Sequence, residues 1–380
     1  MRLLDRYLLR ELLVPFGYCL FGFLIFWDSS ELFTDMSMFQ KLKLNATEVV
    51  TYYGIRTPEI LITILPIAFL LALLYTLTQL ARHHEITAIR AAGVGMFRLA
   101  LPYLTVGVLL SLGVFAMNEL WVPQAIEAAE ELLGRHQPGA VPNAQRATEE
   151  NLTFYNSGER RWWIVESYHV ATGDMVRPRV VWLQPDGTRR DIIAEGATYT
   201  DGVWVFTNVH SVVYNTNSSV LPTQLPADTL EMAVFKETPE QIRSEIKIGK
   251  LFGAKATASA RARMQRKAQL SIKEILDYKR LHPGELNRSA LLDTKLQGRL
   301  AAPWTCLVVV LIALPFGAAS ARRNVFAGVA SSILICFAYF VLQQLSLTYG
   351  TAGTVLPWVA AWAPNAAFGL VGIIVTARVC

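Results

Sequence analysis

Six segments of this 380-residue chain are long and apolar enough to cross a lipid bilayer as helices. Such a helix needs about 20 apolar residues, since each advances about 1.5 Å across a hydrocarbon core of about 30 Å. Charged residues make up 17 % of the chain, whereas soluble domains have about 25 %. We therefore expect a helical membrane protein with spans at residues 12–33, 59–80, 98–121, 300–319, 325–349 and 355–377.

The polar segment between the third and fourth spans predicts an inserted all-β domain. From about residue 150 to 235, short runs rich in Val, Ile, Trp and Tyr alternate with turn residues, including Asp-Gly at 186–187 and 201–202. Asp-Gly between such runs is typical of β-hairpins. Strands at this spacing indicate a small antiparallel sandwich or jelly roll.

Composition divides the chain further. Residues 122–235 hold 8 Lys and Arg against 14 Asp and Glu, whereas residues 236–295 hold 14 against 7. We expect an N-terminal membrane half at 1–125, a β-jelly-roll domain at 126–238, a basic and partly helical connector at 239–297, and a C-terminal membrane half at 298–380. The basic stretch 243–268 is either a solvated linker or an arm that touches anionic lipid.

Short loops rich in arginine predict the orientation in the membrane. Arginines occur near the N-terminus, between the second and third spans, between the fourth and fifth, and near the C-terminus. The positive-inside rule then places both termini in the cytoplasm and the β domain outside. Residues 1–13 predict an amphipathic helix that lies on the inner surface and then enters the membrane, and residues 34–58 predict a link on the outer side.

Motifs for enzymes, metals and nucleotides are missing. His83-His84-Glu85 lacks the second histidine that a zinc-binding helix requires, and 253–257 (GAKAT) lacks the phosphate-loop pattern. No C-x-x-C occurs among the four cysteines. The cores of the second to sixth spans lack Asp, Glu, Lys and Arg, which argues against ion-coupled transport. We expect no catalysis, cofactor, metal or nucleic-acid binding, and energy supplied from elsewhere.

Residues 81–93 (ARHHEITAIRAAG) predict a short helix between the second and third spans, at about 83–92. Glu85 would lie in its first turn, where a carboxylate favours the helix dipole, and Gly93 could end it with a left-handed cap. Ile86 and Ile89 would share one face. Such a helix suits docking into a groove of another protein; alternatively, its arginines only fix topology and it rests on lipid headgroups.

Four stretches in order resemble the LptF/LptG (YjgP/YjgQ) permeases of the lipopolysaccharide export ABC transporter. They are LLDRYLLRELL at 3–13, ARHHEITAIRAAGVGMFRLALP at 81–102, KLQGRLAAPWTCLVVVLIALPFGA at 295–318 and LPWVAAWAPNAAFGL at 356–370. The resemblance implies a bacterial inner-membrane permease that pairs with a paralogous permease above a cytoplasmic ATPase dimer. The resemblance further implies that this permease passes lipopolysaccharide to periplasmic jelly-roll bridge proteins. It also implies that the coupling helix, docked on the ATPase, contains residues His84, Glu85, Ile86, Ile89, Arg90 and Gly93.

One departure from the family concerns the outer end of the first span. Family members can carry basic residues there for lipid phosphates, but 27–36 reads WDSSELFTDM. The nearest bases are Lys41, Lys43 and Arg56, which we expect to contact the substrate; the partner could instead supply these contacts, or the substrate could carry less charge. Two other functions also fit the sequence: an envelope scaffold whose β domain binds partners without moving lipid, and a membrane-anchored enzyme acting on lipid.

Overall fold

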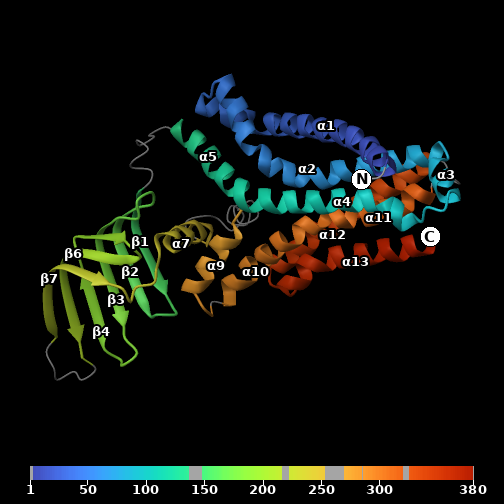
Figure 1. Cartoon of the computed structure of the whole chain (residues 1–380). Helices are drawn as coiled ribbons and strands as arrows, with labels where there is room; N and C mark the ends of the chain where they lie inside the picture. Colours follow the sequence, from blue (N-terminus) through green and yellow to red (C-terminus); the bar gives the residue numbers. More distant parts are fainter. Residues whose placement is uncertain are drawn as a thin grey trace. The chain divides into compact units, whose positions relative to one another are not determined.

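The computed structural model describes residues 3–136, 148–215, 222–252, 269–284, 286–319 and 325–379. The chain divides into two compact units. The helical unit comprises Met1–Pro138 and Asn287–Cys380, and the β unit comprises Gly139–Leu286. Figure 1 shows the helices of the first unit and the strands of the second. Each unit has its own hydrophobic core.

The helical unit contains the predicted spans. Among the described residues, six helical stretches are long and apolar enough to cross a membrane: 3–42, 46–82, 96–135, 289–315, 333–351 and 357–375. The prediction of six spans is therefore confirmed. Its elements are α1 (Leu3–Leu42), α2 (Ala46–Arg82), α3 (Glu85–Ala91), α4 (Met96–Ala116), the π-helical turn η1 (Met117–Trp121), α5 (Val122–Arg135), α10 (Leu286–Ala301), the 3-10 turn η2 (Ala302–Trp304), α11 (Thr305–Ala319), α12 (Val325–Thr351) and α13 (Pro357–Val379).

The first two helices are longer than the predicted spans. The predicted surface helix at the start of the chain is continuous with the first span, because α1 runs without a break from Leu3 to Leu42, about 60 Å at 1.5 Å per residue. The link predicted at 34–58 is also mostly helical, since α2 begins at Ala46. Here α1, α2 and α5 extend together and bury Phe39, Tyr52 and Ala129 against one another. Tertiary packing of these apolar side chains makes a helical hairpin out of a segment whose charges suggested a loop.

At two prolines, Pro15 of α1 and Pro303 of η2, side chains from neighbouring helices donate hydrogen bonds to backbone carbonyls. Pro15 has no N–H, so the carbonyl of Glu11 loses its partner four residues on; the Thr76 hydroxyl of α2 donates to it at 3.0 Å. At the break around Pro303, Ser111 donates to the Pro303 carbonyl at 2.7 Å. Asn365 donates to the carbonyl of Ala301, the last residue of α10, at 2.9 Å. Unsatisfied carbonyls are costly in lipid, which explains these polar residues among apolar ones.

The β unit contains one antiparallel sheet of seven strands, so the prediction of an inserted all-β domain is confirmed. Each strand pairs with the next along the chain, except for β4 and β5. These two short strands lie end to end, and both pair with β3 on one side and with β6 on the other. The sheet is thus a meander, and Ile242 and Ile246 of α7 complete its core. The elements are β1 (Thr148–Asn156), β2 (Arg161–His169), β3 (Met175–Leu183), β4 (Arg189–Ile193), β5 (Gly196–Thr200), β6 (Val203–Tyr214), β7 (Thr223–Met232), α7 (Pro239–Phe252) and α9 (Ile272–Leu281).

A row of residues with left-handed backbone crosses this sheet. Asn151, Arg177 and Asn208 have positive φ angles of 55°, 48° and 51°, and the break between β4 and β5 lies in the same row, at Glu195. The strand pairing keeps one residue opposite one residue on both sides of this row. The buried positions nevertheless change there to the other alternate set: in β6 they change from Trp204 and Phe206 to 209 and 211. Both halves of β6 thus direct apolar side chains to one core.

The predicted Asp-Gly turns are present. Asp201 and Gly202 both have positive φ, at 52° and 84°, as a type I′ hairpin requires, and they join β5 to β6. Gly187 has a φ of 87° in the turn between β3 and β4. These two positions fix the register of the strands that they connect.

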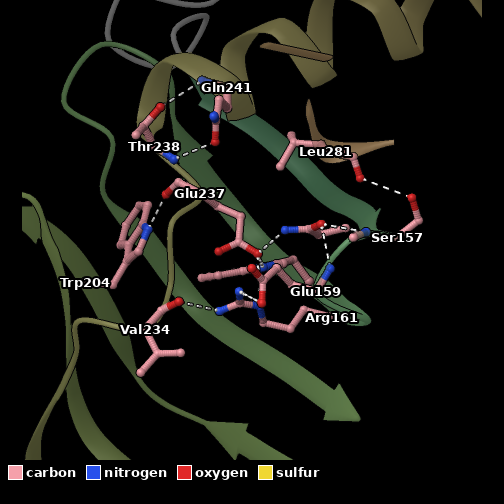
Figure 2. Close-up of polar contacts among 12 residues, drawn as sticks. Ser157, Glu159, Arg161, Trp204, Val234, Glu237, Thr238, Gln241 and Leu281 are labelled. Atoms are coloured by element: carbon pink, nitrogen blue, oxygen red, sulfur yellow. Dashed lines mark hydrogen bonds and ion pairs between the residues drawn. The ribbon is translucent and has the colours of Figure 1, made fainter. Parts of the chain in front are cut away.

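A buried ionic cluster fastens the sheet to α7 (Figure 2). The side chains of Arg161 and Glu237 are both 0 % exposed, with Nε 3.2 Å from Oε1. Glu237 also accepts from Asn156 Nδ2 at 2.8 Å, and its carbonyl accepts from the Trp204 indole at 2.6 Å. Burial lowers the pKa of Arg161, against the pull of the Glu237 charge. The residues just after Glu237 start α7, since Thr238 and Gln241 bond to each other's backbone N–H.

Candidate functional site: the short helix between the second and third spans

The short helix α3 lies at the end of the helical unit where α1 begins and α13 ends (Figure 1). It spans Glu85–Ala91, slightly less than the predicted 83–92. Gly93 has a φ of 85°, its N–H bonds to the Arg90 carbonyl at 3.0 Å, and the next N–H bonds to the Ile89 carbonyl at 3.3 Å. These two bonds form the left-handed cap predicted for Gly93. At the other end, His84 has a left-handed φ of 58°.

Glu85 opens α3 and is half-buried, with its carboxylate tied to the first helix. The Tyr7 hydroxyl of α1 donates to Glu85 Oε2 at 2.9 Å. Two residues earlier on α1, Asp5 forms an ion pair with Arg98 in the first turn of α4 at 2.8 Å. The start of α1 therefore contacts the chain on both sides of α3.

The two isoleucines of α3 turn toward the spans of their own chain. Ile86 is 6 % exposed and belongs to the core of the helical unit, and Ile89 packs against that core. Little of Ile86 is left to contact a partner, Ile89 is half-buried, and the docking role of the pair stays a prediction. Their spacing of three residues did indicate an apolar face, but the face anchors α3 to its own spans.

The outer face of α3 is the surface that remains for a partner. His84, Thr87, Ala88, Arg90 and Ala91 are exposed, with Gly93 just beyond. Glu85 lies at the border of this face and the buried one. The surface thus consists mostly of small side chains, with the base Arg90 and the half-buried carboxylate of Glu85 beside them.

The three bases predicted to contact the substrate do not gather into one site. Lys41 and Lys43 are both exposed at the turn between α1 and α2. Arg56 lies ten residues into α2, about 15 Å along the helix axis. Its guanidinium is already engaged by Glu31 at 2.9 Å and Glu59 at 3.1 Å. The acidic stretch that departs from the family pattern thus supplies one of the partners of Arg56.

Sequence reasoning missed Tyr7, Asp5 and Arg98 as members of this site. Asp5 and Tyr7 lie in a segment interpreted as a free surface helix, and 78 residues separate Tyr7 from Glu85. No spacing rule joins residues so far apart. In the described part of the chain, no three His, Cys, Asp or Glu side chains form a cluster fit for a metal ion.

Comparison with known families decides what kind of protein has this arrangement. A family model described as "Lipopolysaccharide export system permease LptF/LptG" matches residues 6–378. The chain belongs to the LptF/LptG family. A search of curated proteins finds no match. As an LptF/LptG permease, the chain is a multi-pass inner-membrane subunit of a lipopolysaccharide exporter, and α3 occupies the loop between its second and third spans.

Proposed function

We propose that this permease moves lipopolysaccharide out of the inner membrane while a separate cytoplasmic ATPase dimer, docked on the outer face of α3, supplies the energy. A paralogous permease pairs with it, and periplasmic bridge proteins receive the lipid from its β unit. Both termini and α3 face the cytoplasm, and the β unit faces the periplasm. The arginine-rich short loops support this orientation.

The observation that carries the proposal is the construction of α3. Ile86 fixes one face in the core of the spans, while the opposite face is exposed over its whole length. A helix held in this way transmits a push to the spans instead of sliding over them. Glu85 adds a carboxylate that accepts charge-assisted hydrogen bonds, for which an arginine of the ATPase is the best matched donor.

The test replaces Glu85 by alanine in the full chain, co-expressed with its ATPase and partner permease. We expect Glu85→Ala to lower the ATPase recovered with the purified permease at least about tenfold, the lower end for a charged hydrogen bond. Glu11→Ala is the matched control, since Glu11 is an exposed acid on α1 at the same end of the helical unit. Equal ATPase recovery from the two variants would contradict the docking proposal.

The outer turn suggests where the substrate phosphates bind. Lys41 and Lys43 are exposed cations beside the outer end of the first span, and a lysine ammonium binds phosphate as a point charge. Arg56 is the weaker candidate because two carboxylates hold it. Photocrosslinkers at 41 and 43 should capture lipopolysaccharide more efficiently than one at 56. Capture at none of the three positions would remove the substrate contact from this turn.

A further inference from the structure

Two polar contacts join the first turns of α1 to the segments on either side of α3. Tyr7 donates to Glu85 Oε2 at 2.9 Å, and Asp5 pairs with Arg98 at 2.8 Å. Glu85 opens α3 and Arg98 lies in the first turn of α4, so one short piece of α1 bridges both flanks. The side chain of Asp5 is largely buried and that of Arg98 is about two-thirds buried, so solvent screens this pair less than a surface pair.

Apolar packing joins the same segments. Leu8 and Leu12 of α1 are 0 % exposed and belong to the cluster that also contains Ile86 of α3 and Met96 of α4. Around α1, Leu8 and Leu12 lie between Tyr7 and Asp5, so the two polar contacts flank the apolar cluster on either side. Arg6 and Arg10, by contrast, are exposed. One face of α1 is committed to α3, and the other is left to the surroundings.

We propose that Tyr7 and Asp5 tie the start of α1 to α3, so that the two helices move together and movement of α3 reaches the first span directly. Tyr7 is a positioning residue: its hydroxyl occupies Oε2 of Glu85 and leaves Oε1 for a donor outside the chain. An ionised carboxylate has about four acceptor sites, so both contacts can exist together. The inference rests on the proposed function, because it assumes that the ATPase moves α3.

The route from α3 into the bilayer continues along α1. Beyond Leu12, the helix reaches Pro15, where Thr76 of α2 holds the freed Glu11 carbonyl at 3.0 Å. The buried Thr76 hydroxyl supplies the hydrogen bond that Pro15 cannot, and α1 is continuous from Leu3 to Leu42. A displacement of Tyr7 and Asp5 is therefore passed to the first span and is not absorbed at a loop.

The test uses the variants Tyr7→Phe and Asp5→Asn, singly and together, in the reconstituted exporter with its ATPase and partner permease. Tyr7→Phe removes only a hydroxyl and keeps the ring. We expect the ATPase recovered with the double variant to stay within about twofold of the wild type, while lipopolysaccharide released per ATP hydrolysed falls about tenfold, the size expected for hydrogen bonds to charged groups. A structural role alone would lower both quantities together.

Matched controls lie on the same helix. Tyr18→Phe removes a hydroxyl that is exposed and has no hydrogen bond to the described residues, and Glu11→Gln neutralises an exposed acid. Hydrogen exchange of the α3 amides in the full chain gives a second readout that needs no ATPase. Tyr7→Phe should speed this exchange about twofold to tenfold, in proportion to one net hydrogen bond, and Tyr18→Phe should leave it unchanged.

The outcomes separate the inference from the proposed function. If the Glu85→Ala variant recovers as much ATPase as its control, the docking proposal fails whatever the result for Tyr7→Phe. If Glu85→Ala loses its ATPase but Tyr7→Phe and Asp5→Asn match their controls in both readouts, the docking stands and the link to α1 is overturned. Loss of release per ATP together with faster α3 exchange supports the link.

Discussion

The buried pair of Arg161 and Glu237 allows a sharp prediction, because the sheet offers an exposed pair for comparison. The change Glu237→Gln keeps the shape of the side chain and removes its charge. Arg161 then stays buried at 0 % exposure with one remaining carboxylate, Glu159, at 3.1 Å. Breaking a buried ion pair costs about 3–5 kcal/mol. Since Glu159 is exposed and still pairs with Arg161, we expect about 2–3 kcal/mol.

Hydrogen exchange of β1 and β2 in the full chain measures this cost. A loss of about 2–3 kcal/mol speeds exchange through opening of the sheet about 30-fold to 150-fold, at about 1.4 kcal/mol per factor of ten. The control is Glu166→Gln, which breaks the pair with Arg177 at 3.1 Å, where the two side chains are 71 % and 55 % exposed. Such surface pairs contribute less than about 1 kcal/mol, so exchange should change less than about fivefold. Equal effects of the two changes would refute the reasoning from burial.

Two further predictions concern single side chains. Burial would raise the pKa of Asp191, but hydrogen bonds from Arg189 and Arg179 outweigh it and hold this pKa below the usual value. A depressed pKa stabilises the fold above the unfolded value of about 3.9, and this stability is lost as the pH falls through the folded value; acid unfolding of the β unit, followed by tryptophan fluorescence, should therefore depend less on pH in Asp191→Asn. Thr76→Val leaves the Glu11 carbonyl without its 3.0 Å donor and should lower thermal stability in detergent by about 1–3 kcal/mol, whereas Thr47→Val, at an exposed position near the start of the same helix, should have little effect.

The sequence predicted the larger elements of this permease well, because each has a strong local signal. Six apolar segments, the Asp-Gly turns and the cap at Gly93 follow from hydropathy and backbone geometry, and all are present. The strands were also expected, but the row of left-handed residues was not. At this row the alternation of buried and exposed residues changes phase, so in β6 a period of two describes only half of the strand.

The candidate site was predicted only in part, since its chemistry depends on contacts across the fold. The position of Glu85 at the start of a short helix followed from the sequence. The burial of Ile86 and the partner of Glu85 did not, because both depend on where α1 lies. Arg56 shows the same limit: its net charge suggested a free phosphate ligand, but two carboxylates on α1 and α2 engage it.

The position of Pro15 gives α1 unequal arms. The part from Leu3 to Val14 is about 18 Å long, and the part from Phe16 to Leu42 is about 40 Å long. If the helix pivots at this proline, its end at Leu42 travels roughly twice as far as its end at Leu3. A displacement of about 2 Å at the start of α1 would then move the end at Leu42 by about 4 Å. In this case α1 would act as a lever that amplifies the movement about Pro15, where Thr76 bonds to the Glu11 carbonyl.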